Sequence, residues 1–134
     1  MAGYSGTPLP RKLGIPASGR AALIDAPRGF LRLLGPWPKK LEKLPMLSSP
    51  LDYIHLFTIE RSALQALFPK ARDSLVKTGT LWVSWPKQAS GRATDLTENV
   101  VREIGLAAGL VDVKVCAVDE TWSGLKFVYR RKDR

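Results

Sequence analysis

The sequence predicts a three-layer α/β protein whose mostly parallel sheet ends in a C-terminal antiparallel strand pair. Short runs of β-forming, apolar residues alternate with longer amphipathic segments, which is typical of parallel βαβ units with right-handed crossovers. The runs are almost continuously apolar, as strands covered on both faces are. Only a short turn segment separates the last two runs, so these two strands are expected to pair antiparallel.

The chain has 134 residues, which is the length of one domain, so residues 1–134 are expected to form a single domain around one core. A content of 45% hydrophobic and 25% charged residues excludes a collagen-like, mucin-like or wholly disordered chain. The single cysteine, Cys116, excludes an intramolecular disulfide and a cysteine-rich zinc site. No apolar run has the length of a signal-peptide core or a membrane span, so we expect a cytoplasmic protein with no membrane partner.

The elements predicted in the N-terminal part are short. Thr7 and Gly14 are placed as the N-cap and the C-terminal stop of a short helix. Arg20–Asp25 is expected to form a buried strand, and Phe30–Leu34 one or two turns of helix. The next stretch, to residue 50, contains four prolines and leaves room for at most a brief strand near Leu41–Leu44.

The middle of the chain predicts a strand, a helix and a second strand. Asp52–Thr58 is the first strand and Thr80–Trp85 the second. Pro69 is expected to kink or restart the helix between them, and Lys77-Thr78-Gly79 to end it. One apolar stripe defines this helix, formed by Leu64, Leu67, Phe68, Ala71 and Leu75.

A second amphipathic helix is predicted after residue 94. Thr94 or Asp95 is the expected N-cap, with Asp95 and Glu98 spaced as a capping pair and Gly109 placed as the stop. Its apolar stripe consists of Leu96, Val100, Ile104 and Ala107.

The C-terminal residues predict a hairpin. Val113–Val118 and Leu125–Arg130 are the strands, and Asp119–Gly124 is the turn segment between them. With the preceding elements they complete a Rossmann-like arrangement, in which the strands that begin near Arg20, Asp52, Thr80 and Val113 share one parallel sheet.

The charge is strongly basic and unevenly distributed. Lys and Arg total 21 against 12 Asp and Glu, for a formal net charge of +9. Residues 1–50 hold eight basic and two acidic side chains, a balance of +6. This excess favours anionic partners, namely small anionic ligands, acidic proteins or nucleic acid. No base-reading motif accompanies the charge, so any nucleic-acid binding is expected to be non-specific; the alternative is a surface that only keeps the protein soluble.

Ligands of open parallel sheets bind beyond the carboxyl ends of the strands. Four segments are predicted there, residues 25–28, 58–61, 85–95 and 119–123. From them we select nine candidate ligand-binding residues: Asp25, Arg28, Lys87, Ser90, Gly91, Arg92, Asp119, Glu120 and Trp122.

The loop that follows the strand ending at Trp85 is the most suggestive of these segments. Lys87 and Arg92 are expected to flank a phosphate, sulfate or carboxylate, because a helix start supplies unpaired N–H donors. Ser90 and Gly91 would form the turn between them. The loop does not match the G-x-x-x-x-G-K-[ST] phosphate-binding motif, and a capped, solvated loop is the alternative.

The turn of the predicted hairpin could form the opposite wall of such a site. Asp119 and Glu120 could accept hydrogen bonds from hydroxyl groups, and the indole of Trp122 could stack on a ring. Two alternatives are a purely structural hairpin with Trp122 packed under it, and a salt bridge from Lys87 to either acid.

Neither the single histidine nor the single cysteine is assigned a reaction. His55 falls in the middle of a strand, and a hydrogen-bonded core or interface histidine is expected there rather than part of a triad. Cys116 is expected to be a small buried side chain. We predict no catalytic residue and no metal ligand, and the residues leave the cofactor unknown.

Three motifs resemble a family of short bacterial proteins of unknown function: Gly3–Leu9 (GYSGTPL), Trp85–Lys87 (WPK) and Asp119–Leu125 (DETWSGL). That resemblance implies a small bacterial cytoplasmic protein and no particular activity. The elements from Lys77-Thr78-Gly79 to Arg130 also resemble the latter part of class I methyltransferases, which implies adenosylmethionine as a cofactor. Such enzymes place a G-x-G-type loop after the first strand, where this chain has Asp25-Ala26-Pro27-Arg28-Gly29-Phe30.

We therefore predict a Rossmann-like binding module, non-enzymatic or regulatory, that holds a small anionic ligand or a partner at the carboxyl edge of its sheet. One alternative is a degenerate methyltransferase-like enzyme. The other is a non-specific binder of nucleic acid or acidic partners. The sequence predicts no oligomeric state.

Overall fold

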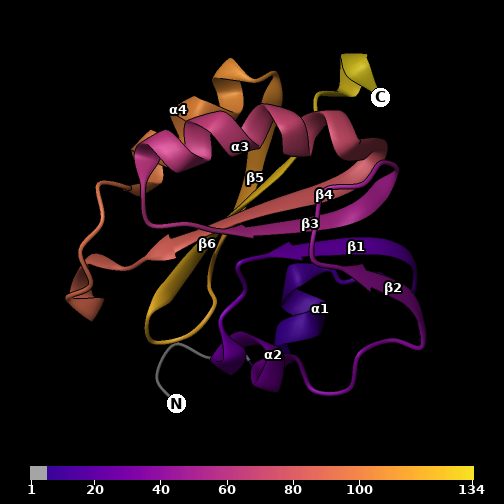
Figure 1. Ribbon diagram of the computed structural model, residues 1–134, viewed down its shortest axis with the longest axis horizontal. Helices are drawn as coiled ribbons and strands as arrows, with labels where there is room; N and C mark the ends of the chain where they lie inside the picture. Colours follow the sequence, from indigo (N-terminus) through magenta and orange to yellow (C-terminus); the bar gives the residue numbers. More distant parts are fainter. Residues whose placement is uncertain (1–5) are drawn as a thin grey trace.

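A six-stranded sheet forms the centre of the molecule, and its strands follow the order β2-β1-β3-β4-β6-β5 (Figure 1). The computed structural model describes residues 6–134, so Gly3, Tyr4 and Ser5 of the N-terminal motif lie outside the described residues. Strands β1 to β4 run parallel, and β6 pairs antiparallel with β5, as the sequence predicts; β6 also pairs antiparallel with β4, which the sequence does not predict. The strands are β1 (Ser18–Ile24), β2 (Lys40–Leu44), β3 (Leu51–Phe57), β4 (Leu75–Pro86), β5 (Leu110–Ala117) and β6 (Trp122–Tyr129).

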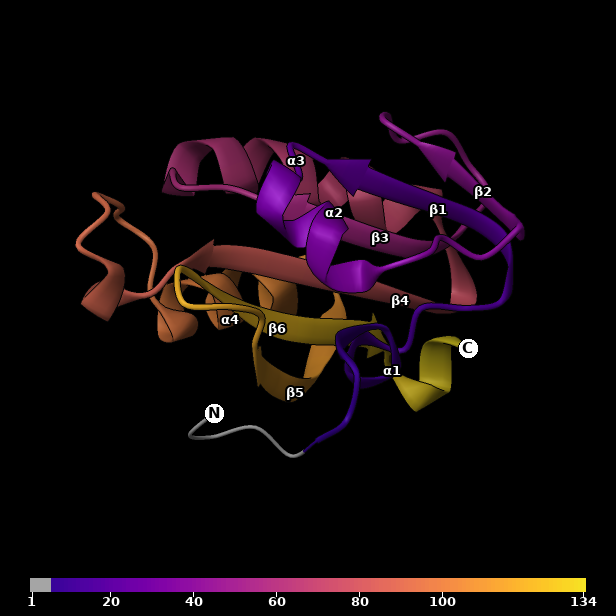
Figure 2. The same cartoon turned by 90° about the horizontal axis from the view of Figure 1, so that it is seen from below.

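Helices cover both faces of the sheet and complete the three layers. Helices α3 (Arg61–Ser74) and α4 (Glu98–Ala107) lie on one face, and α1 (Leu9–Leu13) and α2 (Arg28–Leu34) on the other (Figures 1 and 2). Two short 3-10 helices are η1 (Gln88–Ser90) and η2 (Arg131–Asp133). Within residues 6–134, no helix has the length and apolar character needed to cross a membrane.

The start of α1 differs slightly from the prediction. Pro8, not Thr7, is the N-cap residue, and it contributes no side-chain cap. Because proline has a fixed φ and no N–H, it suits the first positions of a helix. Gly14 ends α1 in the left-handed conformation, with φ of 69°, as its position predicts.

The predicted end of α3 is wrong by several residues. The helix stops at Ser74, and Lys77-Thr78-Gly79 belongs to β4 instead of a turn. Leu75 pairs with Leu51 at the start of β3, so sheet pairing begins directly after the helix. Pro69 lies inside α3 and neither ends nor restarts it.

The predicted cap of α4 is also wrong. Thr97 is the N-cap, and its Oγ1 accepts a hydrogen bond from the Val100 N–H at 3.2 Å. The hydroxyl of Thr94 donates to the Ile59 carbonyl at 2.6 Å, and an Asp95 carboxylate oxygen accepts from the Arg61 N–H at 2.7 Å. These two side chains therefore tie the loop before α4 to the start of α3.

The buried residues of α4 are Val101, Ile104 and Gly105, so Ile104 is the only residue that they share with the predicted stripe. Ala107 of the predicted stripe is exposed. Leu96 is buried but precedes the helix, and Val100 is only half-buried.

In the hairpin, β6 lies between β4 and β5, so β5 pairs only with β6 among the described strands. Parallel strand pairing is therefore confined to β1, β2, β3 and β4. Contrary to the prediction, β5 does not pair in parallel with any of them. Trp122 is the first residue of β6 and is buried.

Candidate ligand-binding site at the carboxyl edge of the sheet

The carboxyl ends of β1, β3 and β4 meet at one edge of the sheet, on the left of Figure 1. Strand β6 begins beside them, because Trp122 pairs with Pro86 at the end of β4. Two cavities that share Arg92 open at this edge. The Trp122 cavity, of about 420 Å³, is lined by residues that include Asp25, Phe57, Thr58, Glu60, Arg92 and Trp122. The Lys87 cavity, of about 520 Å³, is lined by residues that include Lys87, Gly91, Arg92, Thr97, Glu98 and Ser123.

Arg92 forms the wall between the two cavities. Its guanidinium lies over the Trp122 ring, 5.3 Å from the ring centroid, in a cation–π contact. The four ion pairs among residues 6–134 involve neither Arg92 nor Lys87. Both cations therefore keep their charge available for an anionic group in the Lys87 cavity.

Ser90 and Gly91 shape the loop that carries these cations. The Ser90 hydroxyl donates to the Lys87 carbonyl at 2.7 Å and accepts from the Arg92 N–H at 3.2 Å. Gly91 takes the left-handed conformation that closes the 3-10 turn, with φ of 73°. The Lys87 N–H donates to the Thr121 carbonyl at 2.7 Å, which fastens the loop to the hairpin turn.

The predicted acidic wall does not form at either cavity. A carboxylate oxygen of Asp119 accepts hydrogen bonds from the Thr121 and Trp122 N–H groups, at 2.8 and 2.7 Å, and so caps its own turn. Asp119 lines a different cavity, beside α1, and Glu120 is exposed and lines neither of the two at the carboxyl edge. Of the hairpin candidates, the structure brings only Trp122 to the site.

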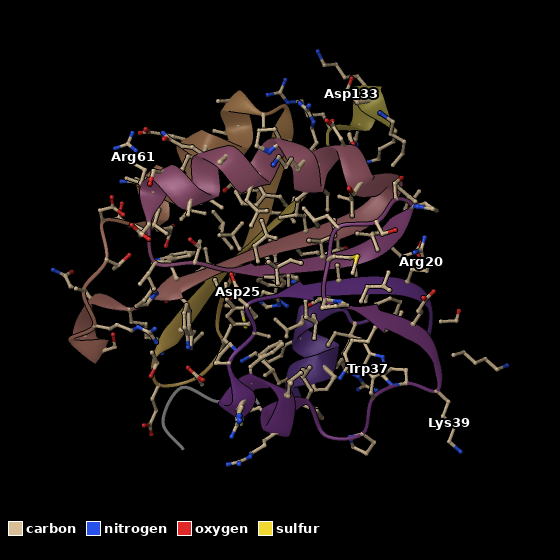
Figure 3. The ribbon with its side chains drawn as sticks, in the orientation of Figure 1. Arg20, Asp25, Trp37, Lys39, Arg61 and Asp133 are labelled. Carbon is tan, nitrogen blue, oxygen red and sulfur yellow. The ribbon has the colours of Figure 1, made fainter. Side chains whose placement is uncertain are left out.

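At the end of β1, Asp25 lines the Trp122 cavity, whereas Arg28 is exposed on α2 and lines neither cavity. Figure 3 labels Asp25 where β1 ends and Arg61 where α3 begins. Asp25 has φ of 58°, and among the described residues it is the only non-glycine with positive φ. This conformation costs about 1 kcal/mol.

Thr58 and Glu60 line the Trp122 cavity but are not among the nine candidate ligand-binding residues. They follow β3 in a segment predicted to lie at the carboxyl edge, but no motif distinguishes them. The position at a strand end was the only available signal.

A buried polar network supports the aromatic floor of the Trp122 cavity. Phe57 contacts the edge of Trp122 and stacks on His55, with centroid distances of 5.3 and 4.3 Å. The His55 ring nitrogens lie 2.7 Å from Ser84 Oγ and 3.1 Å from Tyr53 Oη. Burial lowers the pKa of His55 from 6.5 to about 3, so the imidazole is neutral at neutral pH. His55 is fully buried and acts as a core residue below the cavity.

Comparison with known proteins identifies the fold. No protein-family model and no curated protein sequence matches the chain. Among solved structures, it is similar to a SAH-bound methyltransferase of calicheamicin biosynthesis, with a TM-score of 0.61, 16% identity and coverage of 91% of this chain and 52% of that one. The pyocyanin biosynthetic protein PhzM gives a TM-score of 0.62 at 10% identity, over 91% of this chain and 53% of that one.

A third similar structure is the SAH-bound magnesium protoporphyrin IX methyltransferase of Synechocystis PCC 6803, with a TM-score of 0.57 at 10% identity. That match covers 85% of this chain and 76% of the other. The chain spans only 39% of the length of a pericyclic reaction enzyme that it also resembles, with a TM-score of 0.56. The fold is therefore that of class I adenosylmethionine-dependent methyltransferases.

The residues after β1 do not fit adenosylmethionine in the way a glycine-rich loop does. Pro27, which offers no N–H, is the N-cap of α2. Gly29 is the only glycine of this turn, and a Cβ added there would meet no atom within 4 Å, so no close approach requires it. Rossmann nucleotide sites also carry an acid about 20 residues further on that binds the ribose, whereas β2 ends here at Leu44 and is followed by Pro45 and Met46.

Proposed function

We propose that the protein binds a small molecule bearing a phosphate, sulfate or carboxylate group, and that Lys87 and Arg92 hold this group in the Lys87 cavity. The observation that carries the proposal is that two cations without an ion-pair partner among the described residues line one cavity. Hydrogen bonds between an ammonium or guanidinium and an anionic oxygen are stronger than those between neutral groups. An anion would satisfy both side chains at once.

The surroundings of the Lys87 cavity favour an anion as well. Glu98 is the acid that lines it, and Glu98 already accepts a hydrogen bond from Arg102 at 2.6 Å. The neighbouring Arg102 therefore offsets the negative charge of Glu98. The N-terminus of α4, which begins at Glu98, adds a positive potential at the same place.

Thermal unfolding with added phosphate or sulfate tests the proposal. A ligand present at 100 times its Kd stabilises the folded state by about 2.7 kcal/mol, so the midpoint of the wild type should rise by several degrees. The double variant Lys87→Ala with Arg92→Ala should lose this rise.

A matched control is Arg32→Ala with Lys39→Ala, which removes the same charge from exposed positions outside both cavities. Lys39 lies far from the carboxyl edge (Figure 3). The control should keep the full rise. Equal rises in all three proteins, or no rise with either anion, would contradict the proposal.

Methyl transfer by a degenerate methyltransferase-like enzyme is a second candidate function, and the fold comparison favours it. Its test is calorimetric titration of the protein with adenosylmethionine and adenosylhomocysteine. Saturable binding of either compound would favour this candidate. Absence of binding, in protein that still binds phosphate, would exclude it.

A further inference from the structure

We infer that the Trp122 cavity holds the ring-bearing half of the same ligand, which makes the ligand a phosphorylated sugar or a mononucleotide. The inference rests on the proposed function, because it takes the anionic group to lie in the Lys87 cavity. It adds the chemical nature of the rest of the ligand.

The shared wall indicates that one ligand occupies both cavities. Arg92 lines each of them, so an anion bound by its guanidinium lies directly beside the Trp122 cavity. Together the two cavities fall within the volume range that small-molecule sites span in proteins, about 300 to 1,000 Å³. A free inorganic anion would leave most of this space unfilled.

The charges around the two cavities determine the orientation in which the ligand binds. Asp25 and Glu60 line the Trp122 cavity, and neither belongs to an ion pair among residues 6–134. Their carboxylates repel a phosphate and accept hydrogen bonds from hydroxyl groups. The phosphate is therefore directed to Lys87 and Arg92, and the hydroxyl groups of a sugar to Asp25 and Glu60.

The aromatic wall provides a place for a planar ring. The guanidinium of Arg92 lies over the indole of Trp122, and Phe57 makes a T-shaped contact with the same indole. A nucleobase beside this stack would gain an aromatic or guanidinium contact and should raise the affinity of AMP above that of ribose 5-phosphate. A sugar phosphate fills the same cavity without this contact, so the two ligands are distinguishable.

Calorimetric titration with inorganic phosphate, ribose 5-phosphate, AMP and adenosine tests the inference. We expect ribose 5-phosphate to bind at least tenfold more tightly than phosphate, and adenosine to bind weakly because it lacks the anion. AMP binding more tightly than ribose 5-phosphate would identify a mononucleotide. Equal affinity for the two would identify a sugar phosphate.

The double variant Asp25→Asn with Glu60→Gln should lose the tenfold gain of ribose 5-phosphate but bind inorganic phosphate at least as tightly as the wild type, because both removed charges repel an anion. Its phosphate binding also demonstrates that the variant folds. A matched control, Glu103→Gln with Asp133→Asn, neutralises two exposed acids outside both cavities and should keep the gain.

Two outcomes would overturn the inference and leave the proposed function standing. One is phosphate binding with no gain for ribose 5-phosphate or AMP. The other is a gain that survives unchanged in the Asp25 and Glu60 variant. If phosphate and all phosphorylated ligands fail to bind, the proposed function fails first, and the inference fails with it.

Discussion

The two faces of the sheet are covered by different kinds of structure. On one face, the longer helices α3 and α4 cover a core made mostly of aliphatic side chains, such as Leu64, Val101 and Ile104. On the other, α1 and α2 have only five and seven residues and cover a core rich in aromatic rings, with His55 inside it. Helices this short have little stability of their own, so directed contacts must hold them in place.

One such contact fixes α1. The Trp82 indole N–H donates to the Leu13 carbonyl at 2.8 Å, in the buried interior. On the aliphatic face, the Tyr129 hydroxyl donates to the Arg72 carbonyl of α3 at 2.7 Å, and close packing of helix against strand predominates. Figure 2 shows α1 and α2 in front of the sheet, with α3 and α4 behind it. The difference teaches that the aliphatic face depends mainly on close packing, whereas the aromatic face also depends on the buried hydrogen bonds of His55, and the two should respond to different perturbations.

Acid should weaken the aromatic face most. Because the pKa of His55 is about 3 in the folded state and 6.5 when exposed, the unfolded state binds a proton first as the pH falls. Stability from this residue is complete above pH 6.5 and is lost progressively as the pH falls toward 3. The expected loss is about 2 kcal/mol between pH 7 and pH 5, and more than about 3 kcal/mol by pH 4.

Urea denaturation at a series of pH values measures this loss. The variant His55→Gln cannot take up a proton, so its free energy of unfolding should change much less between pH 7 and pH 5, although it starts lower. A wild-type slope equal to that of the variant in this interval would show that His55 is not the residue responsible.

Close packing should dominate on the aliphatic face. A Cβ added at Gly105 of α4 would overlap the Phe127 ring, and Phe127 is fully buried. Gly105→Ala should therefore lower the free energy of unfolding by about 2 to 3 kcal/mol, despite the better helix propensity of alanine.

Gly29→Ala in α2 is the comparison on the other face. The added methyl would meet nothing within 4 Å, so the gain in helix propensity, about 0.5 to 1 kcal/mol, should appear as added stability. Urea denaturation at neutral pH gives both values. Opposite signs are expected, and destabilisation by both changes would mean that the two faces are packed alike.

The elements that the sequence predicts well are those buried by long-range packing. The strand Asp52–Thr58 and the stripe from Leu64 to Ala71 follow from apolar patterns, because both are buried by long-range packing of one continuous surface. The end of α3 does not follow, since Lys77-Thr78-Gly79 has the composition of a turn. Pairing of Leu75 with Leu51 overrides that local preference.

The residues of the candidate site also fall into two groups, those whose positions the sequence predicts and those whose positions it does not. That Lys87, Arg92 and Asp25 lie at one edge follows from topology alone, because parallel strands end together. The positions of Asp119 and Asp95 do not follow, since short polar side chains bond to whichever backbone N–H is nearest. Asp119 caps its own turn, and Asp95 reaches the first residue of α3.

A local effect is expected at the cap of α4, beside the Lys87 cavity. Thr97→Ala removes the acceptor of the Val100 N–H and should cost about 1 kcal/mol. Asp95→Ala removes the acceptor of the Arg61 N–H, at the start of α3. Amide hydrogen exchange separates the two, because Thr97→Ala should speed exchange at Val100 and Asp95→Ala at Arg61. Faster exchange at Glu98 in the Asp95 variant would instead support the capping pair of Asp95 and Glu98 that the sequence predicts, and would place the N-cap of α4 two residues closer to the loop of Lys87 and Arg92.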